Sequence, residues 1–209
     1  MNLRLNRVSH TGTCDAPLAD RRGYLFNAQR SGGQGYQFDY LKLRHKLEES
    51  GPIWRAYYLN STPHPPTDAQ DAFHTWLRSG PPRGPQLITK LYELKQVRAD
   101  RAYCEQCGTR VNLTCPNGAA HHIGNQQQKG VDVGLATLAL IHRDRYDTLL
   151  LSSGDGDLLD AVEFLSEQGK RIELAVFTEG VATDLQARAD RIHWITDFAN
   201  DVRRDPRSA

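Results

Sequence analysis

The chain has 209 residues, enough for one sizeable hydrophobic core or for one core with a small appendage. Hydrophobic residues make up 39% and charged residues 24%, which is ordinary for a soluble globular protein, and the net charge of +1 argues against a polybasic tail. No apolar run reaches the length of a membrane span, and the N-terminal residues lack the apolar middle of a signal peptide, so we expect a cytoplasmic protein with no membrane partner.

The predicted elements of the first half follow residues 1–21, which show no clear periodicity and are expected to form a flexible leader. Asp39 is a good N-cap for an amphipathic helix. Strands are predicted over 23–27 and 53–59, and helices over 39–49 and 68–78. Residues 86–95 stay ambiguous, because their weak alternation favours a strand while the spacing of their leucines also fits a helix.

The pattern becomes regular after a cysteine-rich insertion at residues 100–128. Helices are predicted over 131–142, 157–168, 182–189 and 196–202, the last capped by Thr196, and strands over 147–151, 171–177 and 192–195. Strands that alternate with helices predict an α/β fold with a parallel sheet covered on both faces. We therefore expect one domain over residues 22–203, which contains the insertion, and a short tail over residues 204–209.

Two carboxylates follow the predicted strand 147–151, in the sequence Ser-Ser-Gly-Asp-Gly-Asp. Sites in parallel sheets form beyond the carboxyl ends of the strands. Asp155 and Asp157 flank Gly156, so both side chains can aim at one point, and Asp132 could join them from the start of its own helix. Crowded carboxylates repel unless a cation neutralises them, and hard oxygen ligands suit Mg²⁺ or Mn²⁺. The alternative is that Asp155 is a turn residue and Asp157 a helix cap.

Three stretches of sequence carry a resemblance to a known family. They read KGVDVGLATLAL from Lys129, YDTLLLSSGDGDLLDAVEFLSEQGKRIELAVF from Tyr146, and DLQARADRIHWI from Asp184. Together they resemble the NYN domain family, the LabA-like (DUF88) branch of the PIN-like nuclease superfamily. The likeness is close over residues 129–197 and looser over 23–95. It implies a Rossmann-like three-layer α/β/α sandwich with a mostly parallel sheet, and a metal-dependent ribonuclease site of clustered aspartates.

The motif residues of the family can be located one by one. Asp132 matches the acid of the K-G-V-D-V motif. Asp155 and Asp157 match the acids of S-G-D-x-D, and Ser153 matches the serine before them. The resemblance implies that the three acids hold Mg²⁺ or Mn²⁺, with Ser153 orienting a ligand or a phosphate.

Two positions depart from the family pattern at the end of the first strand. The family carries I-D-G-x-N there, whereas this chain has Asn27 in place of the acid and Arg30 in place of the following Asn. Asn27 can touch a cation as a neutral fourth ligand but cannot act as a base. Leu138 also stands where many relatives have Asp. Two functions therefore stay open: a metal-dependent endoribonuclease, and a catalytically weak or inactive RNA-binding or protein-interaction module that retains the fold.

The insertion has the ligand spacing of a zinc site. It reads Cys104-x2-Cys107-x7-Cys115-x5-His121, with His122 adjacent. Three thiolates and one of the two imidazoles would complete a tetrahedral structural zinc site, which would staple a polar segment that has no core of its own. The alternatives are reduced cysteines or a redox-active Cys-x-x-Cys pair.

Basic residues around the expected cleft are candidates for contacting RNA phosphates. Lys129 has the best claim because it adjoins the acids. The full set is Arg30, Lys42, Arg44, Lys90, Lys95, Arg98, Arg101, Arg110 and Lys129. We expect RNA, and single-stranded RNA in particular, as the partner, and the sequence leaves a homo-oligomer open.

Overall fold

The structure is a computed structural model that describes residues 2–6, 16–18, 25, 28–79, 87–118 and 121–205. Within these ranges, residues 2–6, 16–18, 30, 31 and 125 are described by their backbone alone. The predicted strand 23–27 lies outside the described residues apart from Leu25, which is fully buried.

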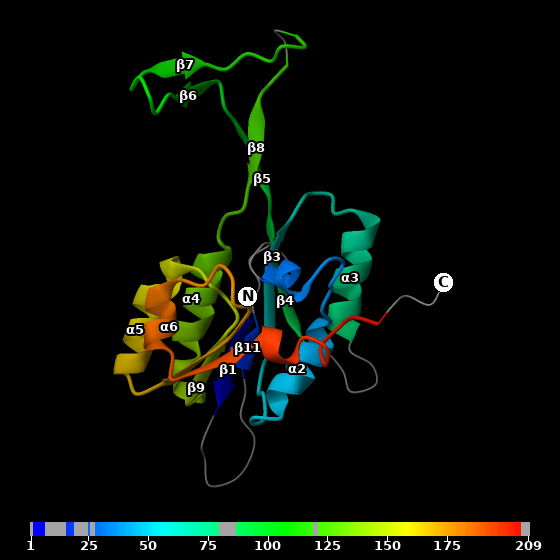
Figure 1. Cartoon of the computed structure of the whole chain (residues 1–209), viewed down its shortest axis with the longest axis vertical. Coiled ribbons are helices and arrows are strands. Elements are labelled where there is room, and N and C mark those ends of the chain that lie inside the picture. The colour runs from blue at the N-terminus through cyan, green and yellow to red at the C-terminus, as the bar shows by residue number, and fades with distance from the viewer. Residues whose placement is uncertain are drawn as a thin grey trace.

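A five-stranded sheet with strand order β11-β10-β9-β1-β2 forms the centre of the molecule (Figure 1). Its strands are β1 (Asn2–Asn6), β2 (Ala16–Leu18), β9 (Thr148–Leu151), β10 (Arg171–Val176) and β11 (Arg191–Trp194). The last three strands are parallel, as the alternation of strands with helices predicted. β1 runs antiparallel to β9 and β2 antiparallel to β1, so the sheet is mixed.

The strands β1 and β2 both lie within the segment 1–21 that we expected to form a flexible leader. The backbone of β1 pairs with β9 from Leu3 to Asn6. Its sequence, Asn-Leu-Arg-Leu-Asn, alternates polar and apolar residues with the period of a half-buried strand. For these strand residues the expectation of a leader is corrected.

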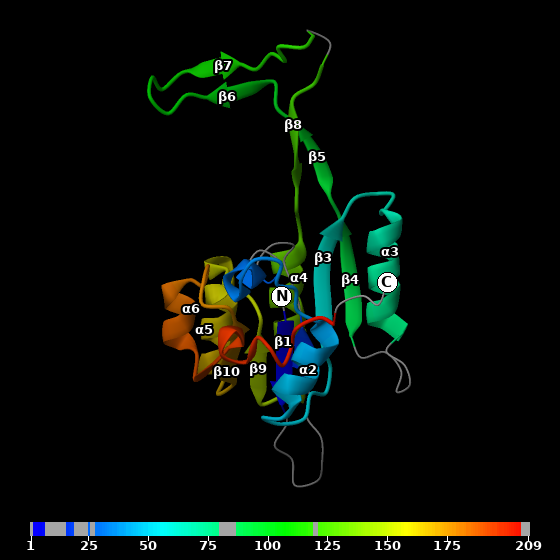
Figure 2. The same ribbon diagram turned by 45° about the vertical axis from the view of Figure 1, so that its right-hand side comes forward.

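A second pair of parallel strands, β3 (Tyr57–Thr62) and β4 (Ile88–Glu93), lies beside the main sheet. β4 settles the ambiguous segment 86–95 as a strand. The chain then leaves the body in a narrow arm (Figure 2). The arm is built from two antiparallel pairs, β5 (Lys95–Arg98) with β8 (Gly124–Gln127) and β6 (Arg101–Tyr103) with β7 (Arg110–Asn112).

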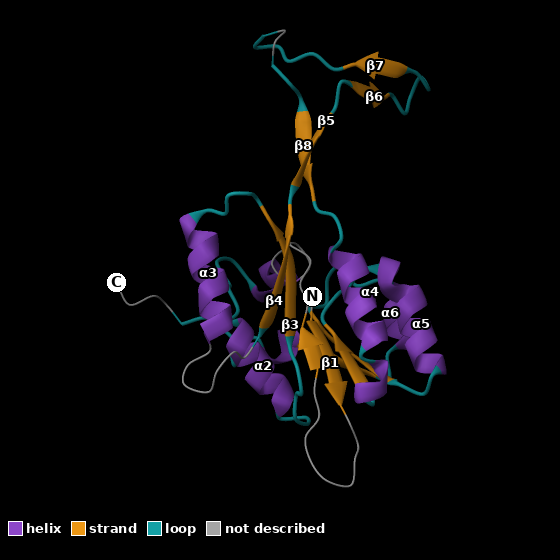
Figure 3. Cartoon of the chain, turned by 180° about the vertical axis from the view of Figure 1, so that it is seen from behind, coloured by secondary structure: helices purple, strands orange, loops and turns teal. Residues whose placement is uncertain are grey.

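Helices cover both faces of the strands (Figure 3). Their bounds are α2 (Tyr40–Glu48), α3 (Asp68–Ser79), α4 (Val131–Ile141), α5 (Leu159–Glu167) and α6 (Thr183–Arg188). Leu149 and Leu151 belong to the core cluster beneath α4, α5 and α6, whereas Leu150 belongs to the cluster beneath α2 and α3. Successive residues of a strand point to opposite faces, so all three leucines of β9 are buried because both faces of the strand are covered.

Local signals explain where these helices begin and end. The side chain of Asp39 accepts hydrogen bonds from the backbone N–H groups of Leu41 (2.8 Å) and Lys42 (3.1 Å), which confirms it as the N-cap of α2. Gly169, at φ 77°, follows the end of α5 in the left-handed conformation typical of helix C-termini. The predicted helices over 68–78, 131–142 and 182–189 are confirmed, with bounds shifted by a residue or so.

The predicted last helix over residues 196–202 is wrong. A short 3-10 helix, η4 (Ile195–Phe198), takes its place, and its N-cap position is Trp194 rather than Thr196. Ile195 and Val202 are both fully buried, so packing rather than helical propensity determines this segment. None of the helices in the described ranges has the length and apolar character needed to cross a membrane.

Candidate functional site

The loop that leaves β9 is held by hydrogen bonds to its Ser153 side chain and to the backbone of Ala182. Ser152, Ser153 and Gly154 are buried. The backbone N–H of Asp155 donates to the Ser153 hydroxyl (3.0 Å), and the N–H of Ala182 donates to the Gly154 carbonyl (2.9 Å). Ser153 therefore shapes the loop that presents Asp155, which is a positioning role for the residue that we expected to orient a ligand.

Asp155 caps the helical turn that follows it. Its Oδ1 accepts a hydrogen bond from the backbone N–H of Asp157 (3.1 Å), at the start of the 3-10 helix η3 (Gly156–Leu158). The alternative reading of the sequence placed the cap at Asp157 and made Asp155 a turn residue, whereas here Asp155 is the cap and Asp157 lies within η3. The second oxygen, Oδ2, is buried. Capping uses one oxygen of the carboxylate, so the cap and a second role for the other oxygen are compatible.

Asp132 lies in the first turn of α4, where the backbone N–H groups point outward and favour negative charge. The residue is half-buried, and its Oδ1 is buried. Gly130, at φ 88°, lets the chain turn from the arm into the helix, and no side chain caps this end. The Asp132 carboxylate is thus the anionic group at the start of α4.

Asp157 is exposed and lines an open groove between α4 and α5, together with Ala136. Asp132 lies four residues before Ala136, hence on the same face of α4 and one turn closer to its N-terminus. Contacts between α4 and η3 hold the two segments side by side. The structure therefore brings Asp132 and the Asp155–Asp157 loop to the same end of the sheet, beyond the carboxyl end of β9.

The other predicted site residues do not form a metal-binding group with these acids within the described ranges. In the described part of the chain, no three His, Cys, Asp or Glu side chains are grouped so as to hold a metal ion. Asn27 lies outside the described residues, and Arg30 is described by its backbone alone, within the 3-10 helix η1 (Gln29–Gly32). Lys129 is exposed, directly before the turn into α4.

Sequence reasoning missed Tyr92, a residue of β4 that packs against the start of α4. A Cβ atom added at Gly134 would collide with the Tyr92 hydroxyl and would lie 2.9 Å from its Cζ. One added at Gly130 would lie 3.2 Å from Cδ1 of the same ring. Burial raises the pKa of Tyr92. Two glycines four residues apart on one helix face were the available signal that a neighbour approaches closely there.

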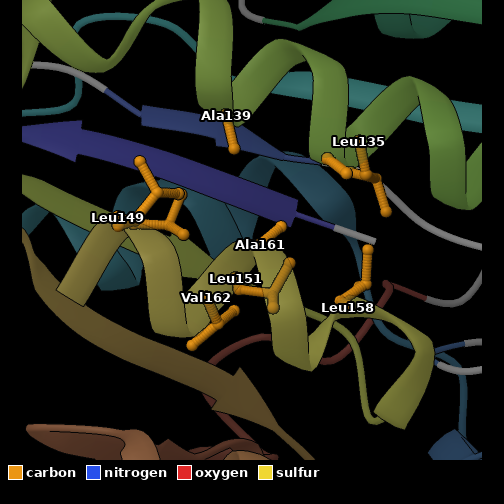
Figure 4. A pocket seen from close by; sticks show the side chains of 9 residues that line it. Leu135, Ala139, Leu149, Leu151, Leu158, Ala161 and Val162 are labelled. Atoms are coloured by element: carbon orange, nitrogen blue, oxygen red, sulfur yellow. The ribbon is translucent and has the colours of Figure 1, made fainter. Parts of the chain in front are cut away.

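A small pocket beneath α4 and α5 has no polar side chain in its lining (Figure 4). It is bounded by Leu135 and Ala139 of α4, by Val162 of α5 and by Leu149 and Leu151 of β9. Such a site offers no group that could recognise a phosphate or hold a cation, so it is space within the core rather than a substrate site.

The turn between β6 and β7 resembles a zinc knuckle in its backbone. Gly108, at φ 67°, donates its N–H to the Cys104 carbonyl, and the Cys104 N–H donates to the Thr109 carbonyl, both at 2.9 Å. The Cys107 sulfur lies 2.9 Å from the Thr109 hydroxyl. Hydrogen bonds from the Thr109 side chain first, and then from Cys104 and from backbone N–H groups, lower the pKa of the Cys107 thiol.

The predicted four-ligand zinc site is not assembled in the described residues. Cys115 and His121 form a separate pair, with Sγ and Nδ1 3.4 Å apart, and His122 is exposed. The β6–β7 ladder stands between this pair and the knuckle, and three strand residues span about 10 Å. A single zinc ion with ligands at about 2.3 Å cannot reach both pairs in this arrangement.

Four aromatic side chains of the first half of the chain pack in or against the core and so do not form a base-stacking surface. Tyr36, Tyr57 and Tyr58 are buried, and Trp54 is partly buried against the core with the Arg55 guanidinium 4.4 Å from its ring centroid. Two of the basic candidates are used in ion pairs on α2, where Lys42 pairs with Asp205 and Arg44 with Glu48. The remaining described candidates are exposed at β4, on the arm, and at its junction with α4.

Comparison with known proteins identifies the family. The model of the NYN domain matches residues 24–196. The chain belongs to the NYN domain family. The match covers α2 to β11 and both acidic segments, as the resemblance implied. No curated protein matches the chain.

A solved structure shows the same overall fold as this NYN domain. It is the crystal structure of VPA0982, a protein of unknown function from Vibrio parahaemolyticus RIMD 2210633. The TM-score is 0.59 at 20% sequence identity, over 90% of this chain and 94% of that one. At this identity the likeness concerns the fold alone.

Proposed function

We propose that this NYN domain is a metal-dependent endoribonuclease that cleaves single-stranded RNA, built on a Rossmann-like three-layer fold of the PIN type. The family supports a nuclease fold. The observation that carries the proposal is the meeting of two acidic segments, Asp132 at the start of α4 and Asp155 to Asp157 after β9, at one end of the sheet.

The donor set fits a hard divalent cation. Asp132 and Asp155 each have a buried carboxylate oxygen, and Asp157 is exposed beside them. One or two carboxylates hold Mg²⁺ in many phosphoryl-transfer sites, where waters and substrate phosphates complete the shell, so three clustered acids are not required. Asn27 stays a prediction for a neutral ligand.

Each residue has a role that follows from its position. Asp155 and Asp132 would hold Mg²⁺ or Mn²⁺, which supplies a nucleophilic water of lowered pKa and charge stabilisation at the phosphate. Ser153 fixes the Asp155 backbone through its 3.0 Å hydrogen bond. Lys129 would contact a phosphate of the RNA from the exposed turn before α4.

A cleavage assay tests the proposal. We expect a labelled single-stranded RNA to be cut internally in Mn²⁺, and cutting to stop on addition of chelator and in an Asp155→Asn variant. Glu167→Gln is the matched control, since Glu167 is an exposed acid at the far end of α5 from the loop. Cleavage that survives both chelator and Asp155→Asn would refute the metal-dependent site.

A second candidate function is an RNA-binding module of low or no activity. It is favoured by the absence of a group of three acids in the described ranges and by Asn27 at the family's acid position. Binding of the same RNA without cleavage supports it. An Asn27→Asp variant that gains cleavage strongly would show that the wild-type site lacks a needed charge.

We also propose that the knuckle at Cys104 and Cys107 supplies two thiolates to a structural zinc ion. Its left-handed Gly108 and the lowered pKa of the Cys107 thiol favour thiolate ligation. Cys115, His121 and His122 lie apart from these thiolates in the described arm, so we assign the ion only the two thiolates of the knuckle. Metal analysis of the purified protein should find about one zinc per chain, lost in Cys107→Ser but kept in Cys14→Ser.

A further inference from the structure

One face of the β6–β7 hairpin carries a set of side chains suited to nucleic acid. Tyr103 pairs with Arg110 across the ladder, and Arg101 pairs with Asn112. Cross-strand partners share a face, as do residues two apart along a strand, so these four side chains lie on the same side of the hairpin. All four are exposed, and Tyr103 keeps 65% of its surface open.

The hairpin has few apolar side chains that could hold it together. An isolated two-stranded hairpin is marginally stable, and this one has only Ala102 and Val111 on its opposite face. Tyr103 packs towards the turn, where a Cβ added at Gly108 would lie 3.3 Å from its hydroxyl. The tyrosine ring therefore leans towards the turn, where a base could stack on it, and the two arginines on the same face can contact phosphates.

The charge of the arm differs from that of the whole chain. Residues 95–128 contain four Lys or Arg and two Asp or Glu, whereas the whole chain has a net charge of only +1. The arm has the chain's average share of basic residues but about half its share of acids, so its net charge is positive, which favours contact with a polyanion.

The arm is placed so that a strand bound to it can continue to the acids. β8 runs into α4 within a few residues, and Asp132 lies in the first turn of α4. Three views show the β6–β7 hairpin turned towards the side of the molecule that holds α4, α5 and α6 (Figures 1, 2 and 3). The hairpin and the helices that carry the acidic segments therefore lie on the same side of the molecule.

We infer that the face formed by Arg101, Tyr103, Arg110 and Asn112 binds single-stranded RNA and guides it to the acidic site. The direction in which the bound RNA runs rests on the proposed function, whereas the binding itself does not. Tyr103 stacks on one base, and the two arginines contact phosphates on either side. Nine residues from Lys95 to Tyr103 span at most about 30 Å. A stacked strand that rises about 3.4 Å per nucleotide needs about nine nucleotides to reach from site to hairpin.

Binding is measured by fluorescence anisotropy with a 20-nucleotide single-stranded RNA in the Asp155→Asn background, which prevents cleavage. We expect Tyr103→Ala to weaken binding by about 5- to 150-fold and Tyr103→Phe to leave it within about twofold, since only the ring is needed. Arg101→Gln with Arg110→Gln should lower the slope of log affinity against log salt by about 1.4, because each phosphate contact contributes about 0.7.

A second pair of arginines provides the matched control. Arg191→Gln with Arg204→Gln removes the same charge from exposed positions away from the arm and should change neither affinity nor slope appreciably. Equal binding by all arm variants, equal losses in the control, or no RNA binding by the parent would each overturn the inference. Duplex RNA bound as tightly as single strands would overturn the stacking role of Tyr103.

Cleavage by the wild-type protein separates this inference from the proposed function. A trinucleotide is too short to touch both hairpin and acids, so Tyr103→Ala should slow cleavage of the 20-nucleotide substrate and leave the trinucleotide unaffected. Absence of cleavage with anisotropy losses as expected would refute the nuclease and keep the RNA-binding face. Normal cleavage with unchanged anisotropy would refute the face and keep the nuclease.

Discussion

Replacing Asp155 by Asn separates the two roles that the structure gives this residue. Oδ1 accepts one hydrogen bond from the Asp157 backbone at 3.1 Å, while Oδ2 is buried. An amide oxygen can still accept that hydrogen bond, so Asp155→Asn keeps the cap and removes the charge. Asp155→Ala removes both.

The expected magnitudes differ widely between the two roles. Loss of the cap in Asp155→Ala should cost about 1 kcal/mol, or about 2–4 °C in Tm for a chain of this size, and Asp155→Asn should cost much less. Loss of a charged ligand should lower metal affinity and cleavage at least about 100-fold, because removing even an outer-shell partner costs 10- to 100-fold.

Thermal unfolding with and without Mn²⁺ provides the assay. At a Mn²⁺ concentration about 100 times Kd, bound metal should stabilise the wild type by about 2.7 kcal/mol, or about 5–10 °C. The same concentration should stabilise Asp155→Asn by only about 0.4 kcal/mol if its Kd rises 100-fold. Glu167→Gln should behave as wild type. If Asp155→Asn keeps both its cleavage and its shift with Mn²⁺, then Asp155 is only a cap and the metal site is wrong.

Three further predictions concern stability. Gly134→Ala in a helix interior would ordinarily gain about 1 kcal/mol, but the collision with Tyr92 should make it destabilising by about 1–3 kcal/mol in urea denaturation, and a Tyr92→Ala background should restore the gain. Burial first, and then the nearby charge of Arg78, lower the pKa of His74 in the folded protein. As the pH falls, His74 therefore binds a proton near pH 6.5 in the unfolded chain but only at a lower pH in the folded one. Stability should therefore fall as the pH drops below about 6.5, and less steeply in His74→Gln; an equal slope would contradict the assignment. The buried Glu173 carboxylate lies 2.7 Å from Nε2 of His193. Glu173→Ala should lower the free energy of unfolding by about 3 kcal/mol, and a decrease below about 1 kcal/mol would show that the pair contributes little.

Much of the α/β body could be predicted because local and tertiary signals agree there. The run of three leucines in β9 requires two covered faces, and Asp39 caps α2 where a helical pattern begins. The acidic loop was located for the same reason, since it directly follows an unmistakable strand.

The failures have a common physical cause, which is that contacts distant in sequence decide the outcome. η4 replaces a predicted helix because Ile195 and Val202 are both buried, and β1 depends on pairing with β9. The spacing of the cysteines predicts a four-ligand site but not the ladder that divides it into two pairs. Tyr92 contacts a helix more than thirty-five residues away in the sequence, and only the glycines it touches gave a local sign of it.

The alternation along β9 has a practical use for spectroscopy. Leu149 and Leu151 face the helices that carry the acids, while Leu150 faces the opposite layer. Isotope-labelled methyl groups of Leu149 and Leu150 would report on the core clusters of opposite sheet faces, although the two residues are neighbours in the chain. Ligand addition should move the first resonance and leave the second as an internal reference, so one strand contains both probe and standard.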